Sequence, residues 1–418
     1  MLVLRLAWRS FVRNRRRSLI TVAAVALSLA MIIVFVGVDN DVHEQMASLG
    51  IRLGEGCIMV QDRGYQENQT LDYLVADPSG IMAAVKSIPG VTQAVPRVRA
   101  NGLLIAGESS APVMVSGVVP TLEPLVSVIP SPDNRVAGAY LRSRNELEFK
   151  NEPADIYIGE ELAKILTLSV GDRTVLTVFP PGASGPAQAA YTVRGIFRTG
   201  IRELDQSYVE VPLYAIQSQL GLSSKVTQVA LFVKNIDDTE RITAEVRDKL
   251  PPGLEVLSWK RALKELYDTI KLDGAGMYLM LGIILIIVAI GIFNTVLMSV
   301  IERIKEFGVM IAMGTSPARV FMIVVTESLI LALIAGACGL AIGLGLHTWI
   351  RTTGIDIGNS WSSYQVAGVF IRGRIYSLIS ASEVIKWTLV VVGMTVASAV
   401  YPAYRATRLR PVEAIRHV

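Results

Sequence analysis

The stretch "IERIKEFGVMIAMGTSPARV" (residues 301–320) is rich in charge and separates two long runs that carry almost none. The run before it, 274–301, has no charged residue, and the run after it, 320–346, has only Glu327. A helix needs about 20 apolar residues to cross the ~30 Å hydrocarbon core of a membrane, so both runs are long enough to span one. The charged stretch is therefore predicted to connect two transmembrane helices.

Composition and two further apolar runs predict a membrane protein with four spans. The 418-residue chain is 51% hydrophobic and only 18% charged, with a mean hydropathy of +0.46, which is too apolar for a soluble protein of this size. The other uncharged runs are 18–38 and the shorter 387–404. Because the apolar core of a cleaved signal peptide has about 7 to 15 residues, the longer first run favours an uncleaved anchor.

Basic residues near the ends of these runs predict the orientation, since Lys and Arg are retained on the cytoplasmic side. The first run follows Arg5, Arg9, Arg13, Arg15, Arg16 and Arg17, and the last precedes Arg405, Arg408, Arg410 and Arg416. Both termini are therefore predicted to be cytoplasmic, although Arg351, Arg372, Arg374 and Lys386 in an external loop oppose the rule. The net charge of +4 comes largely from Arg at the membrane surface, so it does not indicate nucleic-acid binding.

The external segment 39–273 has the turn-rich pattern of a folded α+β domain. Residues 55–98 and 226–258 each read strand, helix, turn, strand, which predicts a split β-α-β subdomain. Residues 99–222 between them predict a β-rich insertion, in which "FPPGASGPAQAA" (179–190) is long for a loop joining two strands. Apolar residues at helical spacing in 259–273 predict a stalk helix.

The connection between the second and third spans has room for one short amphipathic helix. Gly314, followed by Ser316 and Pro317, is typical of a helix end and a new helix start. Phe307 and Met310 lie among the charges and are expected to be displayed beside them. The mixed Glu and Lys content favours docking on a cytoplasmic partner over a linker that follows lipid headgroups, and both alternatives stay open.

Few residues suggest chemistry. Cys57 falls in the external domain and Cys338 inside a span, so they cannot pair within one chain. His43, His347 and His417 are widely scattered and predict neither a metal site nor a catalytic dyad, but three unrelated surface or interface histidines. No Gly-Lys dipeptide occurs, hence no phosphate-binding Walker A loop, and the chain is predicted not to be an enzyme and to bind no cofactor.

Two polar residues fall inside predicted spans. A carboxylate in hydrocarbon is costly unless it faces protein, water or a headgroup, which makes Glu327 notable. Asn294 is expected near the same depth and is a candidate partner. A structural hydrogen bond and a role in substrate handling or gating both stay open for Glu327. Gly336, Gly339, Gly343 and Gly345 indicate close helix packing.

Three stretches resemble a known family. "NTVLMSVIERIKEFGVMIAMGTSPARVFMIVVTESLILALIAGACGLAIG" (294–343) resembles the shared module of MacB/FtsX-like (type VII) ABC transporter permeases. "LAWRSFVRNRRRSLITVAAVALSLA" (6–30) is similar to their elbow and first span, and "YPAYRATRLRPVEAIRH" (401–417) to their tail. The resemblance implies a coupling helix seated on a separate ATPase that binds ATP and Mg, formed by Glu302, Arg303, Lys305, Glu306, Phe307, Gly308, Met310, Met313 and Gly314.

Further stretches resemble the lipoprotein-releasing, Lol-type permeases: 158–178 and 191–221 in the external domain, and 354–380 in the second external loop. This resemblance implies release of lipoproteins from the outer leaflet of the bacterial inner membrane to a periplasmic carrier. In that family a hook loop recruits the carrier, and Phe179, Pro180, Pro181 and Gly182 lie where it would be. Efflux of drugs, peptides or siderophores through an adaptor, and relay of ATP hydrolysis to a cell-wall hydrolase, remain alternatives.

The expected partners are an ABC ATPase dimer, a second permease protomer, identical or not, a lipoprotein, a periplasmic carrier and membrane lipids, with no nucleic acid. The expected fold is an α-helical membrane protein with four transmembrane helices and a large α+β periplasmic domain inserted between helices 1 and 2. Its segments are an elbow helix at 1–17, spans at 18–38, 274–301, 318–346 and 387–404, the periplasmic domain at 39–273, the coupling helix at 302–317, a periplasmic loop at 347–386 and a cytoplasmic tail at 405–418.

Overall fold

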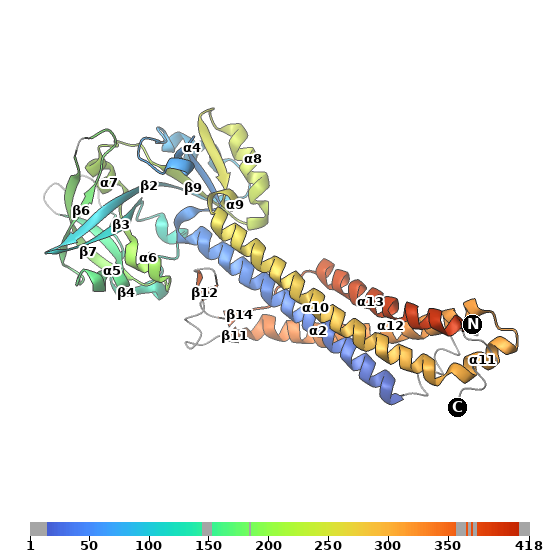
Figure 1. Cartoon of the computed structure of the whole chain (residues 1–418). Coiled ribbons are helices and arrows are strands. Elements are labelled where there is room, and N and C mark those ends of the chain that lie inside the picture. The colour runs from blue at the N-terminus through green and yellow to red at the C-terminus, as the bar shows by residue number, and fades with distance from the viewer. Residues whose placement is uncertain are drawn as a thin grey trace. The chain divides into compact units, whose positions relative to one another are not determined.

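A computed structural model describes residues 15–143, 153–183, 185–356, 365–366, 369–370 and 374–408. The chain forms two compact units, which are described separately. The helical unit comprises 1–44, 271–360 and 372–418, and the α+β unit comprises 45–270 and 361–371 (Figure 1). The predicted elbow helix (1–17) and tail (405–418) lie mostly outside the described residues.

Among the described residues, four helices are long and apolar enough to cross a membrane, which confirms the predicted number of spans. They are α2 (Arg15–Gly50), α10 (Lys264–Glu302), α12 (Pro317–Thr353) and α13 (Ala381–Thr407). Each continues beyond its predicted apolar run, because helix propensity and end capping do not stop where the apolar residues stop. The predicted loop 347–386 is consequently too long at both ends: α12 continues to Thr353, and α13 begins at Ala381 after a capping box in which Ser380 and Glu383 bond each other's backbone N–H.

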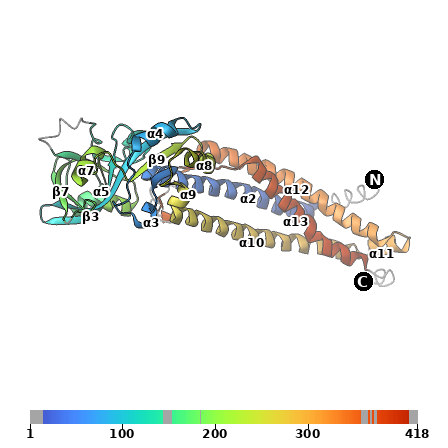
Figure 2. The ribbon, with the colours of Figure 1, turned by 90° about the horizontal axis from the view of Figure 1, so that it is seen from above.

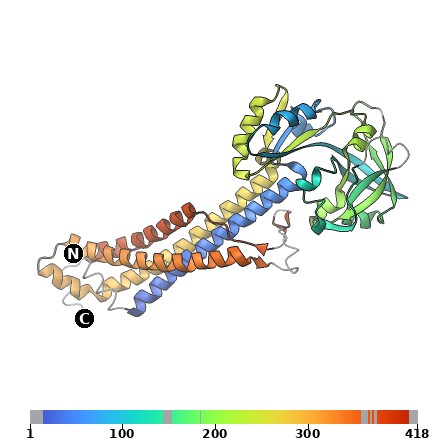
Figure 3. The same ribbon diagram turned by 180° about the vertical axis from the view of Figure 1, so that it is seen from behind.

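Small residues bring α12 close to α2 in the helical unit. A Cβ atom added at Gly339 would lie 2.8 Å from the carbonyl oxygen of Ala26, and one added at Gly343 would lie 2.9 Å from Ile33 Cδ1. Such contacts favour glycine, because they allow two membrane helices to approach closely. Helix α13 lies against α12, as Figure 2 and Figure 3 show.

A ten-stranded sheet organises the α+β unit, with the path β10-β1-β9-β2-β3-β8-β5-β7-β4 and with β6 pairing β2 and β7. The first four strands of this path, with α4 and α8, are the two β-α-β units of the sequence, so their halves lie side by side. Strand β2 belongs to both halves of the sheet, since Val91–Arg97 pair with β9 and Val98–Ala106 pair with β3. The ten strands are β1 (Ile58–Asp62), β2 (Val91–Ala106), β3 (Ser109–Val118), β4 (Arg135–Gly138), β5 (Ala154–Gly159), β6 (Arg173–Val178), β7 (Ala187–Phe197), β8 (Tyr208–Pro212), β9 (Gln228–Val233) and β10 (Leu254–Ser258).

Short helices cover the sheet and join its strands. They are η1 (Ile51–Glu55), α3 (Tyr65–Asn68), α4 (Pro78–Lys86), η2 (Glu123–Leu125), η3 (Pro132–Asn134), α5 (Glu160–Ile165), α6 (Arg202–Ser207), α7 (Leu213–Leu220), η4 (Ile236–Asp238), α8 (Thr239–Lys249) and α9 (Trp259–Ala262). The remaining elements are α11 (Ile304–Ala312), β11 (Ile355–Asp356), β12 (Gln365–Val366), β13 (Val369–Phe370) and β14 (Arg374–Ile375).

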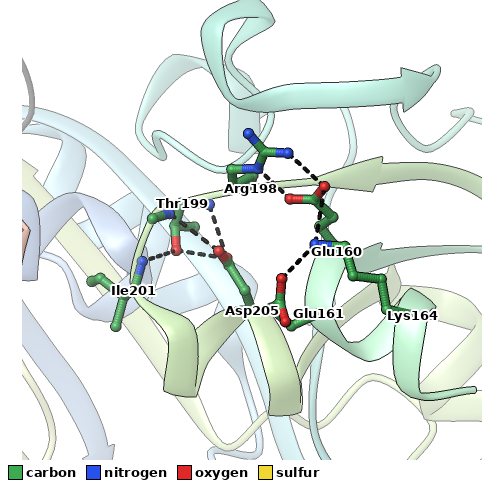
Figure 4. Close-up of polar contacts among 8 residues, drawn as sticks. Glu160, Glu161, Lys164, Arg198, Thr199, Ile201 and Asp205 are labelled. Atoms are coloured by element: carbon green, nitrogen blue, oxygen red, sulfur yellow. Dashed lines mark hydrogen bonds and ion pairs between the residues drawn. The ribbon is translucent and has the colours of Figure 1, made fainter. Parts of the chain in front are cut away.

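Polar contacts fix the corner where β7 ends (Figure 4). Arg198 donates two hydrogen bonds to Glu160 at the start of α5. Asp205 of α6 is buried and accepts from the backbone N–H and the hydroxyl of Thr199, at 2.8 and 2.7 Å. These bonds satisfy the backbone of the turn between β7 and α6 and hold α5 and α6 in place.

Two boundaries differ from the predictions. The connection between β6 and β7 covers 179–186 rather than 179–190, because residues 187–190 pair with β6 as part of β7. The predicted stalk helix 259–273 is interrupted at Leu263, which has a non-helical ψ of 53° and lies between α9 and α10. Trp259 belongs to the core of the α+β unit, with Tyr267 and Ile270 of α10 packed against the same core.

Candidate functional site

The charged connection between α10 and α12 forms the short helix α11 and a tight turn. Gly314 has a φ of +90°, in the left-handed region that favours glycine, and ends the helix. Its N–H and that of Thr315 donate to the carbonyl oxygens of Ile311 and Met310. Pro317 then occupies the first turn of α12, after Ser316. This arrangement is the helix end and restart that the sequence predicts.

One face of α11 packs inside the helical unit. Phe307 is fully buried and Gly308 is buried as well. The side chains packed with Phe307 come from α10, α12 and α13: Val300, Val320, Val324, Ala403 and Ala406. The expectation that Phe307 is displayed to solvent is therefore wrong. Burying a Phe side chain stabilises by about 1.5–3 kcal/mol relative to exposing it, which makes Phe307 an anchor of the helix.

The opposite face of α11 is exposed and mixes charge with apolar side chains. Lys305, Glu306 and Val309 are exposed along one side, and Met313 after the helix is 75% exposed. Met310 is half-buried, and Gly314 is exposed. Of the residues predicted to contact a partner, Lys305, Glu306 and Met313 are among the exposed ones, and the exposed Val309, which was not predicted, completes a set with them. We call this set the α11 face.

Ion pairs hold the junction between α10 and α11. Arg17 of α2 donates two hydrogen bonds to the carboxylate of Glu302, at 2.5 and 2.6 Å. Arg303 bonds Glu306 of α11 at 3.0 Å and Glu327 of α12 at 2.8 Å. Glu302 and Arg303, which the resemblance places at the contact with a partner, thus form ion pairs within the chain.

The predicted pairing of Glu327 with Asn294 is wrong. The carboxylate of Glu327 accepts from the guanidinium of Arg303, and Asn294 is exposed on α10. A cavity of about 40 Å³ adjoins this ion pair. Its polar lining includes side chains of α2, α10 and α12: Arg17, Ser18, Thr21, Thr295, Ser299 and Ser328. A cavity of this size and polarity has room for water beside the charged groups.

The residues assigned to a hook loop belong to the α+β unit. Phe179 is 64% exposed, Gly182 has a left-handed φ of +68°, and Pro180 and Pro181 are half-buried. They form a surface turn between two paired strands. An exposed Phe beside rigid prolines is a feature of binding loops.

The sequence predicts that His43 is an unrelated surface or interface histidine, but in the structure it contacts two carboxylates. Its ring nitrogens lie 3.4 Å from Asp39 and 2.9 Å from Asp273, so it bridges carboxylates of α2 and α10. Ligand atoms of the three residues lie within 4.8 Å of one another, close enough to surround one cation. The i, i+4 spacing of Asp39 and His43 was a sequence signal for part of this cluster. His347 is buried and bonds Ser377, and His417 lies outside the described residues.

A buried charge network lies where η1 leads from α2 into the sheet. Arg97 of β2 is fully buried, bonds Glu123 of η2 and donates to the carbonyl oxygen of Gly54. Arg99 of the same strand donates to Gly54 at 3.1 Å. This network could not be read from the sequence, because its members are spread over three elements. It fixes the start of the α+β unit to both halves of the sheet.

Glu210 of β8 is part of the same buried region. Its Oε2 accepts from Tyr140 at 2.8 Å, and Oε1 has no hydrogen-bond partner among the described residues. Burial, followed by repulsion from Glu123, raises the pKa of Glu210 to about 8. The carboxyl group is consequently protonated at neutral pH in the folded chain.

Comparisons with known proteins cover nearly the whole chain. The family described as MacB-like periplasmic core domain matches residues 18–249, and the family described as FtsX-like permease C-terminal matches 278–411. The lipoprotein-releasing system transmembrane protein LolC of Xylella fastidiosa (strain Temecula1) is 25% identical over 342 residues, 80% of each chain. LolC of Neisseria meningitidis serogroup B is 22% identical over 414 residues, 96% of this chain and 94% of the relative.

LolE of Haemophilus influenzae is 23% identical over 330 residues, 77% of this chain and 76% of the relative. Among solved structures, the periplasmic region of MacB from Actinobacillus actinomycetemcomitans covers 52% of this chain and 95% of its own, at 11% identity and a TM-score of 0.34. Since the MacB-like match alone spans more than half of the residues, this chain belongs to the family of FtsX-like ABC transporter permeases with a MacB-like periplasmic core domain.

Proposed function

We propose that this permease subunit couples ATP hydrolysis by separate ATPase subunits to the release of lipoproteins from the outer leaflet of the inner membrane. The observation that carries the coupling role is the α11 face, an exposed surface on a helix that is anchored from behind by Phe307 and Arg303. ATP and Mg would be bound by the ATPase. This chain supplies a helix that receives the movement and spans that pass it on.

The α11 face has the chemistry of a helix that docks in a groove. Val309 and Met313 offer apolar contact area, and Met is an adaptable side chain at binding surfaces. Lys305 and Glu306 at the edge supply charges of both signs, which orient a partner more than they add affinity. A helix with exposed apolar residues at i and i+4 is a common recognition element.

The exposed apolar side chains of α10 are the reason for proposing a second permease protomer and an acylated cargo as partners. Leu279, Ile283, Ile286, Ile287 and Ile290 are all exposed on this helix. Their surface suits contact with lipid acyl chains, with a second protomer, or with the acyl chains of a lipoprotein held between the first and second spans. Lipoprotein release is proposed because relatives named LolC and LolE align over most of the chain.

The coupling role is tested by co-purification from native membranes. Tagged wild-type chain is expected to bring down an ABC ATPase, whereas Met313→Ala with Val309→Ala reduces the recovered ATPase by about tenfold or more, as the loss of central contacts at an interface does. Met322 is 53% exposed on α12, outside the α11 face, so Met322→Ala controls for the loss of an exposed methionine side chain.

Equal recovery of ATPase by the α11 face variant and by Met322→Ala would contradict the proposal. Phe307 is unsuitable for this test, because truncating a buried anchor would displace the helix whether or not it contacts a partner. Membrane insertion of each variant is checked by its extraction and thermal unfolding.

A further inference from the structure

Arg303 stands at the point where α10 passes into α11. It is the last residue before α11, with a φ of −105° and a ψ of 15°, so the chain bends there. Despite its charge, its side chain is only 9% exposed. Lys and Arg are rarely so buried unless they are paired, and the partners of Arg303 come from two different helices.

The guanidinium contacts three groups at once. Its Nε donates to Glu306 of α11 at 3.0 Å, and one terminal nitrogen donates to Glu327 of α12 at 2.8 Å. The guanidinium carbon also lies 4.9 Å from the ring centre of Phe307, a cation–π distance. Glu327 lies ten residues after the start of α12, about 15 Å along the helix.

We propose that the Arg303–Glu327 ion pair passes the movement of α11 to α12, which makes Arg303 a positioning residue of the transport cycle. This inference rests on the proposed function of α11 as the coupling helix. It assigns to Glu327 a structural partner and a role in coupling, rather than contact with substrate.

The geometry explains why an ion pair is needed in addition to apolar packing. Phe307 packs with Val320 and Val324 of α12, but each dispersion contact is weak and has no preferred direction. The planar guanidinium fixes one register instead, because it must satisfy carboxylates on α11 and α12 together. The bond is also stronger in this largely buried site than it would be in bulk water.

The neighbouring Arg17–Glu302 pair offers a contrast within the same region. Its side chains are 31% and 40% exposed, so solvent and salt screen it. Glu327 is only 20% exposed, and the adjoining cavity of about 40 Å³ leaves room for water if the Arg303–Glu327 bond opens during a cycle. Arg17→Gln therefore serves as the matched control, since it breaks an ion pair at the same end of the bundle without touching α11.

The experiment measures whether α12 moves when ATP is added to the complex of this chain with its co-purified ATPase. Spin labels at Thr353 and Ser382, exposed positions near the ends of α12 and α13, report the distance between these helices. Cys338 is exposed and is replaced by Cys338→Ser, whereas Cys57 is buried. Recovery of the ATPase and the rate of ATP hydrolysis are recorded for every variant.

Wild type and Arg17→Gln are expected to show an ATP-dependent change in distance. Glu327→Gln and Arg303→Gln should retain the ATPase and reduce the fraction of molecules that respond by about tenfold, within the range by which coupling residues act. The double variant should lose no more than either single one, because both remove the same pair. Arg303→Lys keeps the charge next to Glu327 but loses the planar fork that bonds two carboxylates, so its response should lie between those of Arg303→Gln and wild type.

Several results would overturn the inference. Three results would contradict the inference while leaving the proposed function standing. The first is an unchanged ATP response in Glu327→Gln with the ATPase bound. The others are additive losses in the double variant, and a wild type that binds the ATPase without moving α12. Failure of wild type to recover an ATPase contradicts the proposed function and the inference with it. If Glu327→Gln does not fold, Arg303→Gln and Arg303→Lys decide, provided that both fold and bind the ATPase: equal ATP responses of these two variants would contradict the inference.

Discussion

The α+β unit is expected to become less stable as the pH rises, because the carboxyl group of Glu210 ionises less readily in the folded chain than in the unfolded chain. Its folded pKa of about 8 lies above the ordinary value of 4.5. Below pH 4.5 the group is protonated whether or not the chain is folded, and its effect on stability is constant. Between pH 4.5 and 8 the unfolded chain loses the proton and the folded chain keeps it, so the free energy of unfolding falls with pH. Above pH 8 the loss is complete.

The size of this loss follows from the shift in pKa. A difference from 4.5 to about 8, at 1.36 kcal/mol per unit, corresponds to about 5 kcal/mol as an upper estimate. Glu210→Gln cannot ionise and retains an acceptor for Tyr140. The variant is therefore expected to match wild type near pH 4.5 and to be more stable by up to about that amount above pH 8.

Hydrogen exchange of the β8 backbone in the full-length chain, followed by mass spectrometry from pH 5 to 9, measures the local free energy of opening. Intrinsic exchange rates are corrected at each pH. Glu203 is exposed on α6, and Glu203→Gln is the control for the same chemical change away from the buried site. A wild-type opening free energy that does not fall relative to Glu210→Gln as the pH rises would refute the reasoning.

Two further predictions concern packing in the helical unit. Gly339→Ala places a methyl group 2.8 Å from the carbonyl oxygen of Ala26 and is expected to lower the free energy of unfolding by about 1–3 kcal/mol. Gly345→Ala is the control, because its methyl group meets no described atom within 4 Å. Equal unfolding temperatures of the two variants would contradict the close approach of α12 and α2. Phe307→Ala is expected to cost about 3–5 kcal/mol and Phe307→Leu clearly less, and an unfolding temperature unchanged by Phe307→Ala would show that the anchor is not buried in the membrane-embedded protein.

The spans and the split β-α-β units could be predicted because their signals are local. An apolar run of sufficient length or an alternation of strand and turn residues is written in consecutive positions, as in residues 18–38 and 226–258. The predicted ends of the helices agree less well with the structure. Polar residues, such as those preceding Thr353, continue a helix as long as its backbone hydrogen bonds can form.

The internal contacts of the site could not be predicted, because they join distant segments. Arg303 and Glu327 lie on different helices, and His43 and Asp273 are separated by the whole α+β unit. The α11 sequence has apolar residues on more than one face, so its periodicity alone did not reveal that Phe307 points inward and Met313 outward. Only the packing of α10, α12 and α13 around Phe307 decides that question.

The most direct test of the account is mass spectrometry of the complex purified from native membranes with its ATPase, before and after ATP is added. The account predicts a bound acylated lipoprotein that leaves the complex when ATP is hydrolysed. A complex that contains no lipoprotein, and whose ATP hydrolysis responds instead to a small molecule or to a soluble periplasmic protein, would contradict the proposed release of lipoproteins.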